Sequence, residues 1–177
     1  MCSSQNWPTQ RPGSVATWAD RRRVGTGRSW RGTPGHRGVP HTADLRIEAW
    51  AGSCHECVAE SLRGLVDSVA DVRGAAATRT AECQLTGVSP ADMLASAAEE
   101  IIYILDTAGQ VPVSVHARPA GDPDRQQQAA GIVVTLELAN ASAVEFVGAV
   151  PKAVSFYQLT CEPDAAGRWS ATMTVDV

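Results

Sequence analysis

The chain has 177 residues, of which 44% are hydrophobic and 5% aromatic, a length that suits one domain with its own core and leaves little room for two. No apolar run reaches the roughly 18 residues of a membrane-spanning helix, and the first residues, MCSSQNWP, lack the apolar stretch of a secretory signal. We therefore expect a cytoplasmic protein without membrane association.

The net charge of −4 is divided unevenly along the sequence. Residues 1–38 hold seven of the 15 basic residues and one acid, so residues 39–177 hold eight basic and 18 acidic residues, a net charge of −10. Because phosphates need compensating cations, this acidic body argues against direct, high-affinity nucleic-acid binding. If RNA is involved, we expect a partner to hold it.

The first 38 residues are rich in Arg, Gly, Pro, Ser and Trp and show no apolar periodicity. This composition predicts a disordered basic tail that is dispensable for folding, with order beginning near Val39. The cluster Arg21-Arg22-Arg23 suits contact with RNA or with an acidic protein. A solvated tail without a role is the simpler explanation.

A strand followed by a helix opens the predicted domain. Residues 45–49 alternate apolar and polar side chains, which predicts a half-buried strand that ends at Gly52. Ser53 and Glu56 have the spacing of a capping box, so a helix is expected over residues 54–71. Its apolar stripe consists of Val58, Leu62, Leu65, Val66 and Val69.

The remaining sequence predicts one more helix and several strands. Residues 77–87 alternate as a strand does, and Ser89-Pro90 with Asp92 marks the start of a helix that Gly109 ends. Further strands are expected over residues 111–118, 131–138, 154–162 and 169–177. The order predicts an α+β fold, with two helices packed on a mostly antiparallel sheet in a domain of residues 39–177.

Cys54-His55-Glu56-Cys57 has the CxxC spacing of zinc and redox sites. No second Cys/His pair follows to complete a zinc site, and the small or proline residues usual between redox cysteines are absent. Five cysteines are an odd number, and reduced thiols are expected. Structural cysteines are the favoured interpretation, and a zinc- or redox-active protein using Cys54 and Cys57 is the alternative.

Two aspartates stand at the ends of the predicted domain. Asp44 precedes the first strand, and Asp176 is the penultimate residue, on the last strand. Carboxylates gathered in space bind hard cations such as Ca²⁺ at about 2.3–2.6 Å, and the ends of a compact domain often lie close together. From spacing alone, two separate surface acids are the favoured interpretation.

Four segments together resemble the archease family. His41-Thr42-Ala43-Asp44 resembles its N-terminal signature, and Pro151-Lys152-Ala153-Val154-Ser155-Phe156-Tyr157 resembles its Lys-Ala-(Ile/Val)-Thr-Tyr-His strand. Gly167-Arg168-Trp169 and the closing Val175-Asp176-Val177 resemble its Gly-Lys-Trp and Asp-Ile. The helix of residues 89–107 is also similar, and the resemblance covers residues 40–177.

The resemblance implies an α+β accessory protein rather than an enzyme. Carried over by position, Asp44, Asp176 and Val177 would bind Ca²⁺ or another divalent cation. The implied partner is an RtcB-type RNA ligase, whose guanylylation and turnover archeases promote in tRNA splicing and RNA repair. This sequence departs from the family where Ser155-Phe156-Tyr157 replaces Thr-Tyr-His, which puts a role for that strand in doubt. Lys152, the only lysine, is kept.

Overall fold

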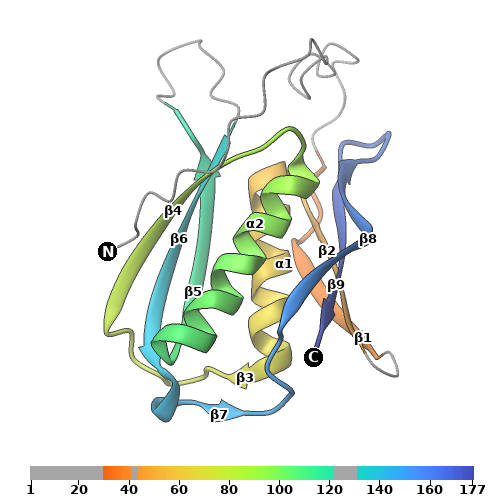
Figure 1. The fold of residues 1–177 in the computed structure, drawn as a ribbon. Helices are drawn as coiled ribbons and strands as arrows, with labels where there is room; N and C mark the ends of the chain where they lie inside the picture. Colours follow the sequence, from red (N-terminus) through yellow and green to blue (C-terminus); the bar gives the residue numbers. More distant parts are fainter. Residues whose placement is uncertain (1–29, 41–43, 122–130) are drawn as a thin grey trace.

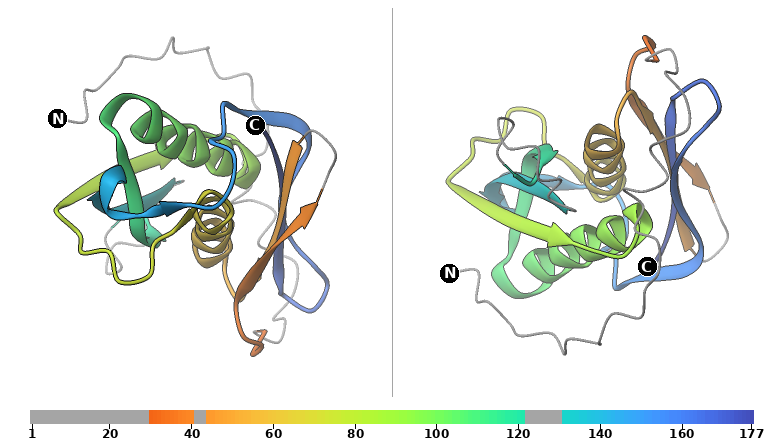
Figure 2. Two further views of the ribbon diagram at one scale, coloured as in Figure 1. Left: turned by 90° about the horizontal axis from the view of Figure 1, so that it is seen from below. Right: turned by 90° about the horizontal axis from the view of Figure 1, so that it is seen from above.

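The computed structural model describes residues 30–40, 44–121 and 131–177, which fold into three layers. Two helices form the middle layer and an antiparallel sheet lies on either side of them (Figures 1 and 2). The predicted α+β class, with two helices on mostly antiparallel sheet, is confirmed. Because the strands are divided between two sheets with the helices between them, each helix is buried on two sides rather than one.

The larger sheet has the strand order β1-β2-β9-β8. Its strands are β1 (Gly35–Pro40), β2 (Asp44–Ala51), β9 (Trp169–Asp176) and β8 (Ala153–Pro163). All neighbours are antiparallel, and β2 and β9, far apart in sequence, form its centre. Alternate residues such as Ile47 and Met173 face the helices, which is the reason for the alternating pattern in the sequence.

The smaller sheet has the order β4-β6-β5, and a short two-stranded ribbon lies apart from it. The sheet consists of β4 (Arg79–Thr86), β6 (Gly131–Asn140) and β5 (Gln110–Pro119). The ribbon pairs β3 (Ala70–Asp71) with β7 (Glu145–Phe146), and a turn of 3-10 helix, η3 (Ala141–Ala143), follows β6. The two-residue strands β3 and β7 are too short to leave a periodic signal in the sequence.

The first helix, α1, spans Cys54–Val69 and begins as the sequence predicts. The Ser53 hydroxyl accepts a hydrogen bond from the Glu56 backbone N–H, with an O–N distance of 3.3 Å. The five residues of the predicted stripe are all buried. The helix packs against β2 on one side and β5 on the other, so it joins the two sheets.

The second helix, α2, spans Pro90–Tyr103 and packs mainly on β8 and β4. Ser89 and Asp92 form a full capping box, in which each side chain accepts a hydrogen bond from the other residue's backbone N–H. The helix then widens into a π-helical turn, η2 (Ile104–Ala108), and ends at Gly109, whose φ of 56° is left-handed. The predicted stop at Gly109 is confirmed, but the π-turn has no signal in the sequence.

The boundary predicted between residues 38 and 39 differs from the structure. Strand β1 already begins at Gly35 and pairs over its whole length with β2, from Gly35 opposite Trp50 to Pro40 opposite Leu45. The Gly- and Pro-rich segment GHRGVP has no strand pattern of its own, and its order comes from pairing with β2 and from contacts with α1. Residues 1–29 of the predicted tail lie outside the described residues.

Strand β8 contains an irregularity in the segment that departs from the family pattern. The register with β9 shifts between Ser155 and Thr160, and Gln158 has a φ of 57°. Phe156 and Tyr157, which lie in this bulge, are both largely exposed to solvent. The predicted strand 154–162 is therefore present, but its middle bends out of the sheet.

A close approach between α1 and the larger sheet yields a first prediction. A Cβ added at Gly64 would lie 2.8 Å from Ile47 Cγ2 and 3.1 Å from His36 Cδ2. Alanine normally stabilises a helix interior by about 0.5–1 kcal/mol relative to glycine, but overpacking a core costs about 1–3 kcal/mol. We expect Gly64→Ala to lower the thermal midpoint by about 2–4 °C in a thermal melt.

The matched control for this substitution is Gly38→Ala. A Cβ added at Gly38, on the outer strand β1, would meet nothing within 4 Å. We expect this variant to melt at or slightly above the temperature of the parent protein. A higher midpoint for Gly64→Ala would show that α1 and β2 have more room between them than their contacts indicate.

Candidate metal site at the end of the larger sheet

The two aspartates named from the sequence face each other across the central pair of strands. In the β2–β9 register, Asp44 lies directly opposite Asp176, and Leu45 lies opposite Val175. Leu45 and the buried Val175 pack toward the helices, so both aspartates point to the outer face of the sheet. Figure 1 shows the C-terminus at this end of the sheet, where β1 ends and β2 begins.

This placement fits a divalent cation. Directly opposite residues in an antiparallel pair have Cβ atoms about 4.5–5.5 Å apart, and Ca²⁺ takes carboxylate oxygens at about 2.3–2.6 Å. Two carboxylates at this spacing can therefore share one ion. Without a cation the two like charges repel each other, which destabilises the pair. A cation of the hard, oxygen-preferring class removes that cost.

Val177 is the third residue of the predicted ligand set. Within residues 30–40, 44–121 and 131–177, no group of three or more His, Cys, Asp or Glu side chains is placed to hold a metal ion. Val177 follows Asp176 directly after the end of β9 and is exposed. His41, Thr42 and Ala43 of the predicted signature lie outside the described residues.

Strand β8 completes the surroundings of the aspartate pair. Ala153 lies opposite Asp176, and the backbone N–H of Lys152 donates to the Asp176 carbonyl oxygen with an N–O distance of 2.8 Å. The small Ala153 side chain leaves the outer face open beside Asp176. Lys152 is exposed next to this end of the sheet, so it stands where a docked partner could meet it.

Arg46 is a neighbour of the site that the sequence did not single out. It lies two residues along β2 from Asp44, on the same outer face, and its Nε is 3.5 Å from Glu48 Oε1. That approach lacks hydrogen-bond geometry, and Arg46 Nε is buried with no hydrogen-bond partner among the described residues. Arg37 makes the closer pair with Glu48, with an Nη2–Oε2 distance of 2.6 Å. Arg46 also donates through Nη1 to Gln158 Oε1 over 3.4 Å, so the outer face near the two aspartates carries two arginines, Arg37 and Arg46, that both have partners.

The cysteines of the alternative interpretation lie at the start of α1. Cys57 is fully buried, and its thiol donates to the Ala49 carbonyl oxygen at an S–O distance of 3.8 Å. Burial lowers the pKa of the His55 imidazole below its usual value, against an opposing effect of the Glu56 carboxylate. Because zinc needs four ligands and the described residues assemble no such group, the zinc alternative gains no support from the structure.

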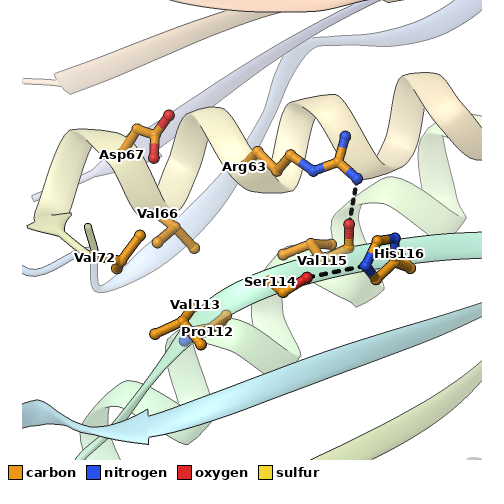
Figure 3. Close-up of a pocket in the computed structure, with 9 residues that line it drawn as sticks. All are labelled: Arg63, Val66, Asp67, Val72, Pro112, Val113, Ser114, Val115 and His116. Atoms are coloured by element: carbon orange, nitrogen blue, oxygen red, sulfur yellow. Dashed lines mark hydrogen bonds between the residues drawn. The ribbon is translucent and has the colours of Figure 1, made fainter. Parts of the chain in front are cut away.

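A pocket of about 220 Å³ lies between α1 and β5, and neither Asp44 nor Asp176 lines it (Figure 3). Inside it, Ser114 Oγ and His116 Nε2 are 3.0 Å apart, a separation that a nucleophile and its base would have. The two residues are neighbours on one face of β5, and among the described residues no carboxylate hydrogen-bonds to His116. Arg63 is occupied by Glu60 and by the Val115 carbonyl oxygen. This pocket therefore lacks the third member of a catalytic triad.

No helix in the part of the chain that the structure describes is long and apolar enough to cross a membrane.

Comparison with known proteins relates the whole described domain to one family. Residues 36–177 match the sequence profile of the archease protein family (MTH1598/TM1083). The chain is 43% identical over 143 residues to the probable protein archease of Mycobacterium tuberculosis, in strains CDC 1551 and H37Rv, and the match covers 81% of this chain and 75% of the relative.

Two solved structures share the fold. Protein 1598 of Methanobacterium thermoautotrophicum superposes with a TM-score of 0.58 at 18% identity, over 81% of this chain and 99% of its own. An archease of Thermotoga maritima described as a possible chaperone gives 0.53 at 18% identity, over 78% and 94%. At 18% identity these two structures show only that the fold is shared. The family profile and the mycobacterial relatives show similarity in sequence. The chain belongs to the archease family.

Proposed function

We propose that the protein is a cytoplasmic, metal-binding accessory factor that activates an RtcB-type RNA ligase, by promoting its guanylylation and turnover in tRNA splicing and RNA repair. The observation that carries the proposal is the register of β2 with β9, which sets Asp44 opposite Asp176 in a chain of the archease family. The possible chaperone role stated for the Thermotoga maritima relative also supports action on another protein.

In this proposal the aspartate pair and Val177 hold Ca²⁺ or another divalent cation. A bound cation would supply positive charge at the end of the sheet that meets the ligase. The chain's own residues hold the ion, align the ends of β2 and β9, and present Lys152 beside them. The RNA stays on the ligase, because the body of this chain is acidic and offers few cations to phosphates.

The direct test is a ligation assay with the ligase well below the concentration of RNA. The substrates are an RNA end with a 2′,3′-cyclic phosphate and an RNA end with a 5′-hydroxyl, with GTP and the metal of the ligase present. We expect the chain to raise product per ligase several-fold and to speed formation of the ligase–guanylate adduct. A ligase that turns over and takes up guanylate equally well without this chain would contradict the proposal.

The cysteine alternative is tested in the same assay. Reduced protein carrying Cys54→Ala and Cys57→Ala together is expected to stimulate the ligase to within about twofold of the parent, because neither thiol lies on the outer face with the aspartates. The fold of the double variant is checked by its thermal midpoint. A well-folded double variant without any stimulation, or stoichiometric zinc lost with these cysteines, would favour the alternative.

A further inference from the structure

Cys54, Cys57 and Cys161 lie on neighbouring elements where α1 begins over the larger sheet, although they do not form a metal-binding group. Cys161, on β8, lies opposite Ala171 of β9, and Ala171 lies opposite Ala49 of β2. The thiol of Cys57 reaches down from α1 to the carbonyl oxygen of that same Ala49. The row from β2 to β8 consists of small side chains facing the helices, so sulfur atoms from α1 and β8 have room to approach each other.

The thiols are in contact through hydrogen bonds. Side-chain hydrogen bonds to Cys54 and, second, to Cys57 raise the pKa of the Cys161 thiol well above its usual range, and its burial adds to the effect. Cys161 therefore keeps its proton and stands as the donor to its neighbours. Of the two neighbours, Cys54 contributes more to this rise in the pKa of Cys161.

The three thiols differ in access to solvent. Cys57 is fully buried and Cys161 is 5% exposed, so neither is open to a dissolved oxidant. Cys54 is only partly buried and is the first residue of α1. A helix N-terminus favours negative charge, and a thiolate is the nucleophilic form of cysteine. Cys54 is thus the thiol that an oxidant reaches first, with Cys161 directly behind it.

We propose that Cys54 and Cys161 form a reversible redox pair that responds to hydrogen peroxide. The Cys54 thiolate attacks one peroxide oxygen, the O–O bond breaks, and the products are a sulfenic acid and hydroxide, which takes up a proton to become water. The Cys161 sulfur then attacks the Cys54 sulfur, the S–O bond breaks, and the Cys161 proton leaves with the hydroxyl as a second water. Two thiols are oxidised to one disulfide while one peroxide is reduced to two waters.

Cys161 is a better partner than Cys57 although Cys57 is closer in sequence. The Cys57 thiol already donates to the Ala49 carbonyl oxygen inside the core, and turning it toward Cys54 would break that bond. A disulfide to Cys161 instead ties the first turn of α1 to the edge strand of the larger sheet. It closes a loop of over a hundred residues, which restricts the unfolded chain strongly.

Peptide mapping identifies the paired cysteines directly. The full chain, carrying Cys2→Ser so that the first cysteine cannot compete, is treated with about one equivalent of hydrogen peroxide, blocked with a thiol reagent and digested with trypsin without reduction. Cleavage at the Arg and Lys residues places Cys54 and Cys57 in peptide 47–63 and Cys161 in peptide 153–168. We expect these two peptides joined by one disulfide, a thermal midpoint higher by about 5 °C or more, and reversal of both by dithiothreitol.

Variants then assign the sulfur within peptide 47–63. Cys54→Ala is expected to abolish the joined peptides, and Cys57→Ala to keep them. Cys83→Ala, which changes a buried cysteine of the smaller sheet, is the matched control and is expected to keep them too. The proposal is overturned by a Cys54–Cys57 disulfide within peptide 47–63, by sulfinic acid on Cys54 without any joined peptide, by thiols that all survive the peroxide, or by joined peptides in Cys54→Ala.

Discussion

Replacing Asp44 or Asp176 with alanine is expected to weaken Ca²⁺ binding and stimulation of the ligase by at least about tenfold each, because either change removes one of the few ligands of the proposed ion. Calorimetric titration with Ca²⁺ measures the first effect and the multiple-turnover ligation assay the second. The free protein should lose no stability, since either variant removes one of two like charges that face each other.

A thermal melt separates a lost site from a lost fold. In the parent protein, Ca²⁺ should raise the thermal midpoint, because an ion that binds only the folded state stabilises it by mass action. In both variants this rise should vanish while the midpoint without Ca²⁺ stays equal or increases. Extending the chain by one residue after Val177 should weaken binding in the same way if its carboxyl group is the third ligand.

Glu162→Ala is the matched control for these variants. Glu162 is an exposed acid on β8, opposite Ser170, near the other end of the same sheet. Its loss changes the net charge as much as the loss of Asp44 does, so it corrects for any general electrostatic effect. Undiminished Ca²⁺ binding in both aspartate variants, or equal loss in Glu162→Ala, would remove the aspartate pair from the proposed site.

Deleting residues 1–38 is expected to lower the free energy of unfolding by about 2–4 kcal/mol, whereas deleting residues 1–29 is expected to change it by less than about 0.5 kcal/mol. The longer deletion removes most of β1 and with it His36. The His36 ring places Nδ1 2.9 Å from Glu60 Oε2 and Nε2 3.0 Å from Asp67 Oδ2, so it fastens β1 to α1. The loss should appear as a midpoint lower by about 4–16 °C in a thermal melt.

The full chain with His36→Ala separates the side chain from the strand. This variant keeps the backbone pairing of β1 with β2 and loses only the two contacts with α1, so an intermediate loss of about 1 kcal/mol is expected. If the proteins that start at residues 30 and 39 were equally stable, β1 and its contacts with α1 would not stabilise the domain, contrary to the structure. Equal stability would also restore the boundary at residue 38 that the sequence alone suggests.

The sequence predicts well those elements whose signals are local. Ser53 and Ser89 begin their helices as cap residues should, and Gly109 ends the second helical segment in a left-handed conformation. The stripe of α1 and the alternation along β2 and β9 give the buried positions correctly, because each element buries one face with its own period. These are properties of a few consecutive residues, and no knowledge of the rest of the chain is required.

Elements that depend on partners far away in the chain cannot be predicted from local sequence patterns. Strand β1 has glycine, proline and charged residues where a strand pattern is expected, and it is ordered by β2 and α1. The π-turn η2 looks like more α-helix, and the division of the strands between two sheets is invisible in their order along the chain. The sequence singles out Asp44 and Asp176 by their places at the two ends of the domain and by the family resemblance, and the register of β2 with β9 sets them face to face.

The same limit applies to the cysteines. The CxxC spacing draws attention to Cys54 and Cys57, while Cys161, more than a hundred residues away, has no neighbour that marks it. Only the packing of α1 over the row of alanines brings the third thiol to the other two. The alternating pattern of β8 predicts which of its residues face the helices. It does not predict which helix residue each of them contacts.

The pairing of β2 with β9 has a consequence for synthesis on the ribosome. The centre of the larger sheet joins two strands with more than a hundred residues between them, so the contact of highest sequence separation is also the one that completes the core. Before Trp169 and the rest of β9 have been synthesised, one edge of β2 is unpaired and its apolar face, which includes Ile47, is uncovered. Unpaired edges and exposed apolar faces promote association with other chains. Nascent chains that stop before β9 should therefore need protection from chaperones, and should become resistant to protease only once the last strand has left the ribosomal exit tunnel.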